Sequence, residues 1–178
     1  IKNLEKIKKI LDNYKKYQFN IIFNSAIYDK KNDTIEDKKN ILNINFFNQM
    51  FFYEYLVKKL EIKVSKLIFF SSFEAVKKYS NMQYYRLSKI MYIDEFYKIT
   101  QNVNSPCVKL FVFGGIKTES YYKNSKMKKN MITKNLPKDV NSAVNFILKK
   151  ISTNKSEIIY YPKYYYYLHS LLKLIKKS

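Results

Sequence analysis

Four short apolar runs recur along the chain, and stretches with helical spacing separate them. The runs are FNIIFNSA (19–26), KLIFFSS (66–72), CVKLFVF (107–113) and EIIYY (157–161). Continuous apolar runs of this length are typical of strands that are buried on both faces, as in parallel sheets. Because parallel strands need long crossover connections, the alternation predicts an α/β fold with helices on both faces of a parallel sheet.

The stretches between these runs predict the helices. Helical periodicity is present over residues 2–17, 44–60, 84–101 and 137–150, the last with Pro137 at a first-turn position. Residues 28–40 predict a charged connection with room for a helical turn, and residues 117–136 predict a polar loop. Residues 163–178, after Pro162, predict a C-terminal apolar helix or tail. We expect residues 1–178 to form a single domain, since that length suffices for one core.

Composition excludes several classes of protein. No run of 18 apolar residues is present, so no membrane-spanning helix is expected. The single cysteine, Cys107, and the single histidine, His169, cannot form a disulfide framework or a Cys/His metal site. This cysteine usage fits a reducing, cytoplasmic location, and we expect no metal.

The net charge of +20 raises the question of nucleic-acid binding. Arg86 is the single arginine among the 34 basic residues, whereas proteins that grip phosphates and read bases favour arginine. The chain is also rich in Lys, Asn, Ile, Tyr and Phe, which AT-rich codons favour. We therefore interpret the charge as a solvated lysine coat, expect no nucleic acid as a partner, and keep nucleic-acid binding as the less favoured alternative.

A tyrosine followed four residues later by a lysine lies on one helix face, where an ammonium can stabilise a phenolate. In so lysine-rich a chain, chance gives roughly three such pairs, so the spacing alone carries no information. The three pairs present are Tyr55/Lys59, Tyr85/Lys89 and Tyr122/Lys126. The second pair differs in context, because Ser72 ends a predicted strand thirteen residues before Tyr85, and Asn45 lies another 27 residues upstream.

In this order the motifs resemble those of the short-chain dehydrogenase/reductase family, in its compact single-domain branch. FNSA (23–26) is similar to the family's strand-end Asn-Asn-Ala-Gly motif, and NINFFNQMF to the segment with its catalytic Asn. LIFFSSFEA resembles the strand that ends in the catalytic Ser, and YYRLSK the Tyr-x-x-Ser-Lys helix. FGGIKT resembles the Pro-Gly-x-x-x-Thr turn that contacts the nicotinamide. Five motifs in the right order are far more specific than any one of them.

The resemblance implies a three-layer Rossmann-like sheet and an NAD(P)-dependent oxidoreductase. A hydride would pass between the nicotinamide and a carbonyl or alcohol substrate, with Tyr85 as general acid/base. The implied catalytic residues are Asn45, Ser72, Tyr85 and Lys89. The implied contacts to NAD or NADP are Asn24, Ser25, Ala26, Tyr85, Lys89, Gly114, Ile116 and Thr118. The family also implies a homodimer or homotetramer, paired through the helices at 44–60 and 84–101.

The sequence departs from the family pattern at several positions. Ser25 and Ile27 replace the second Asn and the Gly of the first motif, and Phe113 replaces the Pro of the turn. The family's Gly-rich pyrophosphate turn has no counterpart, since the two glycines are Gly114 and Gly115. We therefore expect the C-terminal portion of the fold, without its N-terminal third, and expect residues 1–178 alone to be poorly soluble and inactive.

Two further expectations concern an alternative function and a membrane contact. A relative that kept the α/β core as a non-catalytic binding or scaffold module is the alternative to the enzyme. The apolar and lysine side chains of 163–178 could also place that helix on an anionic membrane surface.

Overall fold

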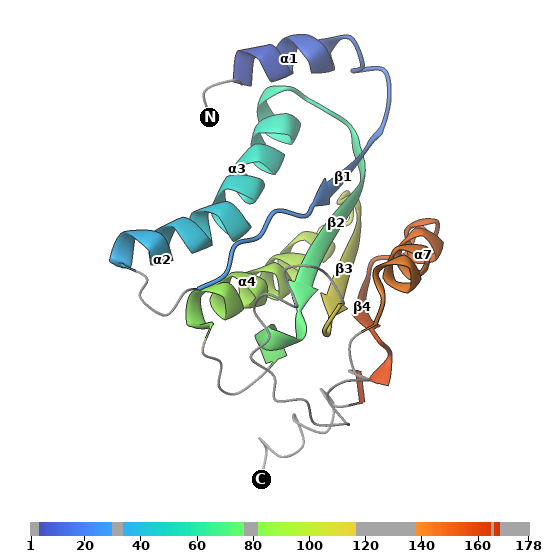
Figure 1. Ribbon diagram of the computed structural model, residues 1–178. Helices are drawn as coiled ribbons and strands as arrows, with labels where there is room; N and C mark the ends of the chain where they lie inside the picture. Colours follow the sequence, from blue (N-terminus) through green and yellow to red (C-terminus); the bar gives the residue numbers. More distant parts are fainter. Residues whose placement is uncertain (1–3, 30–33, 77–81, 117–137, 165, 168–178) are drawn as a thin grey trace.

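In the computed structural model, the described residues are 4–29, 34–76, 82–116, 138–164 and 166–167. They form an α/β structure around a four-stranded parallel sheet of order β1-β2-β3-β4. The strands are β1 (Phe19–Phe23), β2 (Val64–Ser72), β3 (Cys107–Phe113) and β4 (Glu157–Tyr161). Each apolar run of the sequence is therefore a strand, and the predicted fold class is confirmed (Figure 1).

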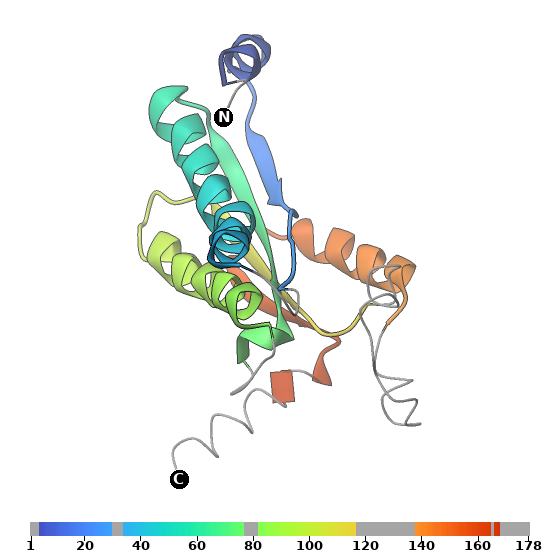
Figure 2. The same ribbon diagram turned by 60° about the vertical axis from the view of Figure 1, so that its left-hand side comes forward.

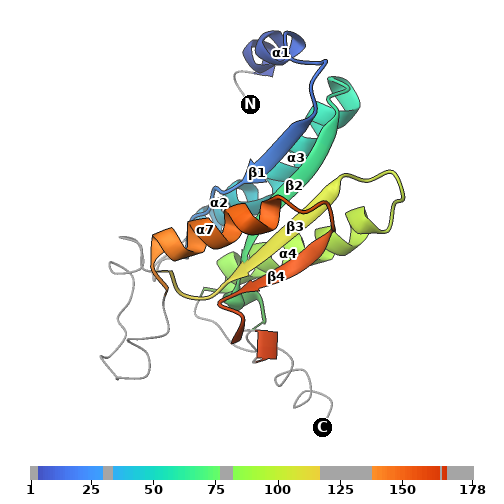
Figure 3. The same cartoon turned by 90° about the vertical axis from the view of Figure 1, so that its right-hand side faces the viewer.

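Helices cover both faces of the sheet. One face carries α2 (Ile35–Leu42), the π-helical turn η1 (Asn43–Phe47), α3 (Asn48–Glu54), a second π-helical turn η2 (Tyr55–Lys59) and α4 (Gln83–Thr100). The helix α7 (Val140–Ile151) covers the opposite face, so the molecule has three layers (Figures 2 and 3). The N-terminal helix α1 (Leu4–Asp12) lies beyond the end of the sheet where β1 begins (Figure 1).

Alternate side chains of the strands fill the two interfaces. Phe69 and Leu110 point to the α3/α4 side, where they pack with Tyr92 of α4. Ile68 and Phe111 belong to the other cluster, against α7. All four strand side chains are fully buried, and each contributes about 2 kcal/mol by removal of apolar surface from water. The central strands β2 and β3 are therefore buried on both faces, which explains why they read as continuous apolar runs. The edge strand β1 differs, because its Asn20 and Ile22 are exposed, so the expectation that this apolar run is buried on both faces is wrong.

The helical layer begins earlier than the sequence pattern predicts. Residues 35–42 form the regular helix α2 inside the charged stretch that was expected to be a connection. A capping box starts it: the Asp37 amide donates to the Thr34 hydroxyl at 3.1 Å, and the Thr34 amide donates to the Asp37 carboxylate at 2.9 Å. The helical run from Ile35 to Lys59 is continuous, so the expected start at residue 44 is wrong.

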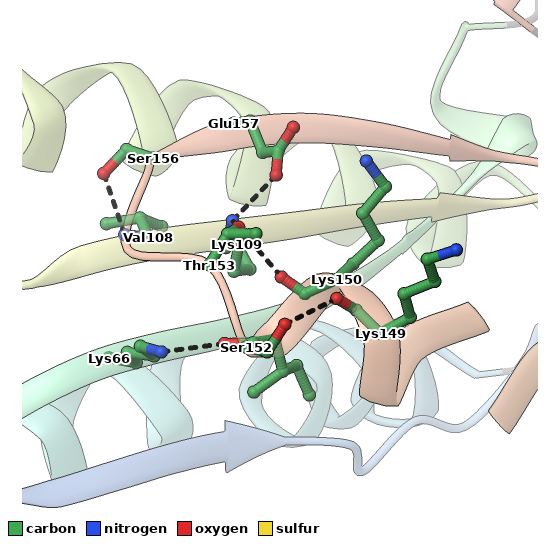
Figure 4. A network of polar contacts seen from close by, with 10 residues as sticks. Lys66, Val108, Lys109, Lys149, Lys150, Ser152, Thr153, Ser156 and Glu157 are labelled. Carbon is green, nitrogen blue, oxygen red and sulfur yellow. Dashed lines mark hydrogen bonds and ion pairs between the residues drawn. The ribbon is translucent and has the colours of Figure 1, made fainter. Parts of the chain in front are cut away.

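Helix α7 begins at Val140, three residues later than expected, because the Asp139 carboxylate accepts the Ser142 amide at 2.8 Å and caps it. Pro137 lies outside the described residues. Two lysines of the sheet bind the C-terminal end of α7 and the residues that follow it. The Lys66 ammonium donates to the Ile151 carbonyl at 2.8 Å, and buried Lys109 donates to the Thr153 hydroxyl (Figure 4). Cations at a helix C-terminus are favourable, since the helix dipole is negative there.

Lys109 also forms an ion pair with Glu157 of the adjacent strand, at 2.7 Å (Figure 4). This pair joins β3 to β4 beneath α7. Within the described residues, no helix combines the length and apolar character that a membrane span requires. Most of the predicted C-terminal segment 163–178 lies outside the described residues, so its proposed membrane contact stays a prediction.

Candidate active site

The candidate site lies where the carboxyl ends of the strands meet the start of α4 (Figure 1). Phe23 at the end of β1 pairs with Phe69 of β2, and Ser72 at the end of β2 pairs with Phe113 of β3. The residues that follow β1 and β3 are therefore brought to the same edge as Ser72. In open parallel sheets, ligands bind at this edge.

Tyr85 lies in the first turn of α4 and is buried. Lys89 follows one turn later on the same face, with its ammonium nitrogen 5.4 Å from the centre of the Tyr85 ring. That nitrogen donates a hydrogen bond to the Phe70 carbonyl of β2 at 2.8 Å. The helix therefore presents a phenol and an ammonium together at the sheet edge, which confirms the geometry that the Tyr/Lys spacing predicts.

Burial strongly raises the pKa of Tyr85 above its ordinary value, and the charge and hydrogen bond of Tyr28 raise it further. A hydrogen bond from the Ser72 side chain acts in the opposite direction and lowers this pKa, because it stabilises the phenolate. The end of β2, where Ser72 lies, is therefore near Tyr85. Tyr85 is a neutral phenol at physiological pH.

Burial lowers the pKa of Lys89 to about 8. The side chain is enclosed between α4 and β2, with a second aromatic ring, that of Tyr92, 5.1 Å from the ammonium nitrogen. Ser71 secures the backbone of the same residue, because its hydroxyl donates to the Lys89 carbonyl at 2.9 Å. Lys89 is thus a mostly protonated but readily titrated cation beside the phenol.

Asn45 is fully buried in η1, in the middle of a helical run rather than at a helix start. Its Oδ1 accepts the Ile27 amide at 2.7 Å, and its Nδ2 donates to the Ile27 carbonyl at 2.8 Å. Nδ2 also lies 3.2 Å from the Ser88 hydroxyl, which donates to the Tyr85 carbonyl at 2.7 Å. Asn45 therefore joins the segment after β1 to the Tyr85 helix. π-Helical turns of this kind are frequent at functional sites.

The segment after β1 carries the expected cofactor contacts Asn24, Ser25 and Ala26, which are exposed. The Gln49 side chain fixes its backbone, because Nε2 donates to the Ser25 carbonyl at 3.0 Å and Oε1 accepts the Tyr92 hydroxyl. Sequence reasoning missed Gln49. The available signal was its position four residues after Asn45, on the same face of the helix.

Tyr28 and Asp29, also missed, reach Tyr85 from the same segment. The Tyr28 ring lies 4.5 Å from the Tyr85 ring, centre to centre. The Asp29 carboxylate accepts the amides of Tyr84 and Tyr85 at 2.9 and 3.0 Å. No local pattern reveals such partners, because 55 residues separate Asp29 from Tyr84.

The turn after β3 is held to its neighbours by backbone bonds. The Gly114 amide donates to the Tyr161 carbonyl at 2.9 Å, and the Gly115 carbonyl accepts the Lys138 amide at 3.0 Å. Ile116 pairs with Lys138 in an isolated parallel bridge. Gly114 and Ile116 thus follow the strand that neighbours Ser72, while Thr118 lies outside the described residues. Contact of any of these residues with a cofactor stays a prediction.

Among the residues that the structure describes, no group of three or more His, Cys, Asp or Glu side chains is placed to hold a metal ion.

Sequence comparison identifies no relative: no protein-family model and no curated protein matches the chain. Solved structures do match. A short chain dehydrogenase from Burkholderia cenocepacia J2315 in complex with NADP has a TM-score of 0.73 at 15% identity, over 98% of this chain and 72% of that one.

Two further matches have the same character. 4-Hydroxyisoleucine dehydrogenase complexed with NADH has a TM-score of 0.71 at 16% identity, over 88% of this chain and 72% of that one. A short-chain dehydrogenase from Streptomyces avermitilis has a TM-score of 0.69 at 14% identity, over 97% of this chain and 72% of that one. The chain therefore has the Rossmann-like fold of the short-chain dehydrogenases.

Proposed function

We propose that the protein is an NAD(P)-dependent oxidoreductase of the short-chain dehydrogenase/reductase type, which interconverts a carbonyl and an alcohol. The observation that carries the proposal is the placement of buried Tyr85 and Lys89 on one face of α4, with the ammonium 5.4 Å from the centre of the phenol ring, at the carboxyl edge of a parallel sheet. The fold supports it, since the similar solved structures include dehydrogenases in complex with NADP and NADH.

The donor set at the sheet edge fits a nicotinamide nucleotide. A lysine ammonium has three N–H donors, so Lys89 can bind the Phe70 carbonyl and still donate to ribose hydroxyl groups. The exposed side chains of Asn24 and Ser25 follow β1 at the same edge and add polar groups. NAD and NADP both fit this description, and the bound nucleotide would supply or accept the hydride.

Tyr85 would donate the proton that the substrate oxygen needs during carbonyl reduction. Its raised pKa keeps the phenol protonated but also makes proton donation costly, so neighbouring groups would have to stabilise the phenolate. The Ser72 hydroxyl, at the end of β2, would hold the carbonyl oxygen beside the phenol and share its developing charge.

Lys89 would lower the cost of the phenolate. An ammonium within a few ångströms of a phenolate in a poorly solvated site stabilises the charge, and each pKa unit corresponds to about 1.4 kcal/mol. Asn45 would act indirectly, because its hydrogen bonds hold the Ile27 backbone and the Ser88 side chain in place.

The experiment uses the intact protein as its gene encodes it. Binding of NADH and NADPH is measured by titration calorimetry, and loss of the reduced nucleotide is followed by absorbance against a panel of aldehydes and ketones. Nucleotide-dependent reduction of at least one carbonyl compound is the expected result. Failure to bind either nucleotide would contradict the proposal and favour a non-catalytic scaffold. Salt-resistant binding of nucleic acid instead would favour the lysine coat as a functional surface.

A further inference from the structure

The first turn of α4 is capped from a distant part of the chain. The Asp29 carboxylate accepts the Tyr84 amide at Oδ2 and the Tyr85 amide at Oδ1, at 2.9 and 3.0 Å. The first amides of a helix have no partner within the helix, and a carboxylate is the favoured acceptor because the dipole is positive there. Met82, which precedes the helix, has no side-chain oxygen with which to cap it. Asp29 therefore fixes where α4 starts.

Tyr85 belongs to the turn that Asp29 binds. Because one oxygen of the carboxylate accepts the Tyr85 amide itself, the bond fixes the Cα of that tyrosine relative to the segment after β1. Charge-assisted bonds of this kind are among the stronger hydrogen bonds in proteins. Without the two hydrogen bonds to Asp29, the first turn of α4 could fray, and Tyr85 would lose its fixed position.

Tyr28 holds the side chain of the same tyrosine. Its ring packs on the Tyr85 ring at 4.5 Å between centres and 39° between planes. Tyr28 is 41% exposed, whereas Tyr85 is 7% exposed, so the Tyr28 ring covers Tyr85 on the solvent side. The two neighbouring residues therefore hold Tyr85 at two places, the backbone and the ring.

The segment that carries Tyr28 and Asp29 is itself anchored. The preceding residue, Ile27, is bound through both its amide and its carbonyl by the Asn45 side chain. Contacts therefore run from Asn45 through the segment after β1 to Tyr85. A displacement of that segment would therefore also displace the Tyr85 side chain.

We propose that Tyr28 and Asp29 are positioning residues for Tyr85, Asp29 through the backbone of α4 and Tyr28 through its ring. The inference rests on the proposed role of Tyr85 as the general acid. Neither residue has to touch the substrate, because each acts on the acid.

The kinetic test compares Asp29→Ala with Asp139→Ala in the intact protein. Both variants remove a carboxylate that caps a helix, but Asp139 caps α7, on the other face of the sheet. Asp29→Ala is expected to lower kcat by 10- to 100-fold with little change in the KM for the nucleotide, since small misplacements of a reacting group have such effects. Asp29→Asn, which keeps one acceptor oxygen, should recover part of the loss. Equal kcat losses in the two Ala variants, or none in either, would overturn the inference.

A second readout does not depend on turnover. In protein labelled with ¹³Cζ-tyrosine, Tyr85→Phe identifies the Tyr85 signal, whose shift reports the environment of its hydroxyl. The signal is expected to move in Asp29→Ala and in Tyr28→Ala, and to stay in place in Asp139→Ala. If the intact protein reduces no carbonyl compound, the proposed function fails while this comparison still decides the inference. An unmoved Tyr85 signal in both variants would refute it.

Discussion

The ammonium nitrogen of Lys89 donates a hydrogen bond to the Phe70 carbonyl at 2.8 Å, in an interface that leaves 4% of the lysine exposed. The cation of the candidate site is thus a part of the helix–sheet packing. Its burial has a cost, which is visible as a pKa of about 8 instead of 10.5. A buried charge of this kind is usually retained at functional sites.

Lys89→Met should change how stability depends on pH. Between pH 8 and 10.5 the unfolded chain binds a proton at this lysine that the folded protein has lost, so wild-type stability should rise with pH through that window. The gain is up to about 1.4 kcal/mol per pH unit, and about 3 kcal/mol in all. Urea unfolding of wild type and Lys89→Met at pH 7, 9 and 10 measures this gain. The unfolding free energy of wild type minus that of Lys89→Met should grow with pH.

Lys98→Met is the matched control, since Lys98 lies on the same helix but is exposed. Its unfolding free energy should follow that of wild type at every pH. The comparison with Lys89→Met also cancels the titration of the buried tyrosines, which lowers stability above pH 10 in all three proteins. Parallel pH curves for wild type and Lys89→Met would show that the lysine is not desolvated.

Asn45→Ala should destabilise the protein by about 2 kcal/mol, because a fully buried amide loses its bonds to Ile27 and leaves polar groups without partners. Asn45→Asp should recover little, since a carboxylate cannot donate to the Ile27 carbonyl. Asn48→Ala, three residues along the same helical run and exposed, should cost less than about 0.5 kcal/mol. Chemical denaturation of the three variants checks this, and an equal loss for Asn45→Ala and Asn48→Ala would contradict it.

Glu157→Ala should be far more costly than loss of an exposed ion pair. It leaves the charge of Lys109, which is 0% exposed, with no carboxylate partner, and such uncompensated charges cost about 3–5 kcal/mol. Glu54→Ala breaks the exposed pair with Lys58 and should cost about 0–1 kcal/mol. Lys109→Met, which removes the buried charge itself, should cost less than Glu157→Ala. Thermal unfolding ranks the three, and a smaller effect of Glu157→Ala than of Lys109→Met would be inconsistent with a buried cation.

The central strands were predictable because both of their faces are covered, which makes β2 and β3 continuous apolar runs, whereas β1 was found from its apolar residues although Asn20 and Ile22 are exposed. β2 begins two residues before the predicted start, at Val64, and α4 begins one residue before its own. Helix α2 was missed because Ile41 is its single buried residue, so it shows almost no apolar periodicity. Its capping box, Thr34 and Asp37, is the signal that identifies it.

The central residues of the site were predictable, whereas their supports were not. Ser72, Tyr85 and Lys89 are recognisable from their fixed spacing along one strand and one helix, and their catalytic roles stay predictions. Asp29 acts through bonds to backbone amides 55 and 56 residues away, which leave no local pattern. Gln49 left one signal, its position four residues after Asn45 on the same helix face. The π-helical turn around Asn45 was also unpredicted, since it continues the helical run on both sides and no residue type marks the change to i→i+5 hydrogen bonds.

The role of Tyr85 is tested most directly by comparing Tyr85→Phe with Tyr84→Phe in the intact protein, with the reduced nucleotide and a carbonyl substrate that wild type accepts. Each variant removes one phenolic hydroxyl from adjacent positions of the same helix turn. The account predicts that Tyr85→Phe lowers kcat/KM by at least about 100-fold, as expected for loss of a general acid, while Tyr84→Phe stays within a few-fold of wild type. Retention of activity in Tyr85→Phe would contradict the account.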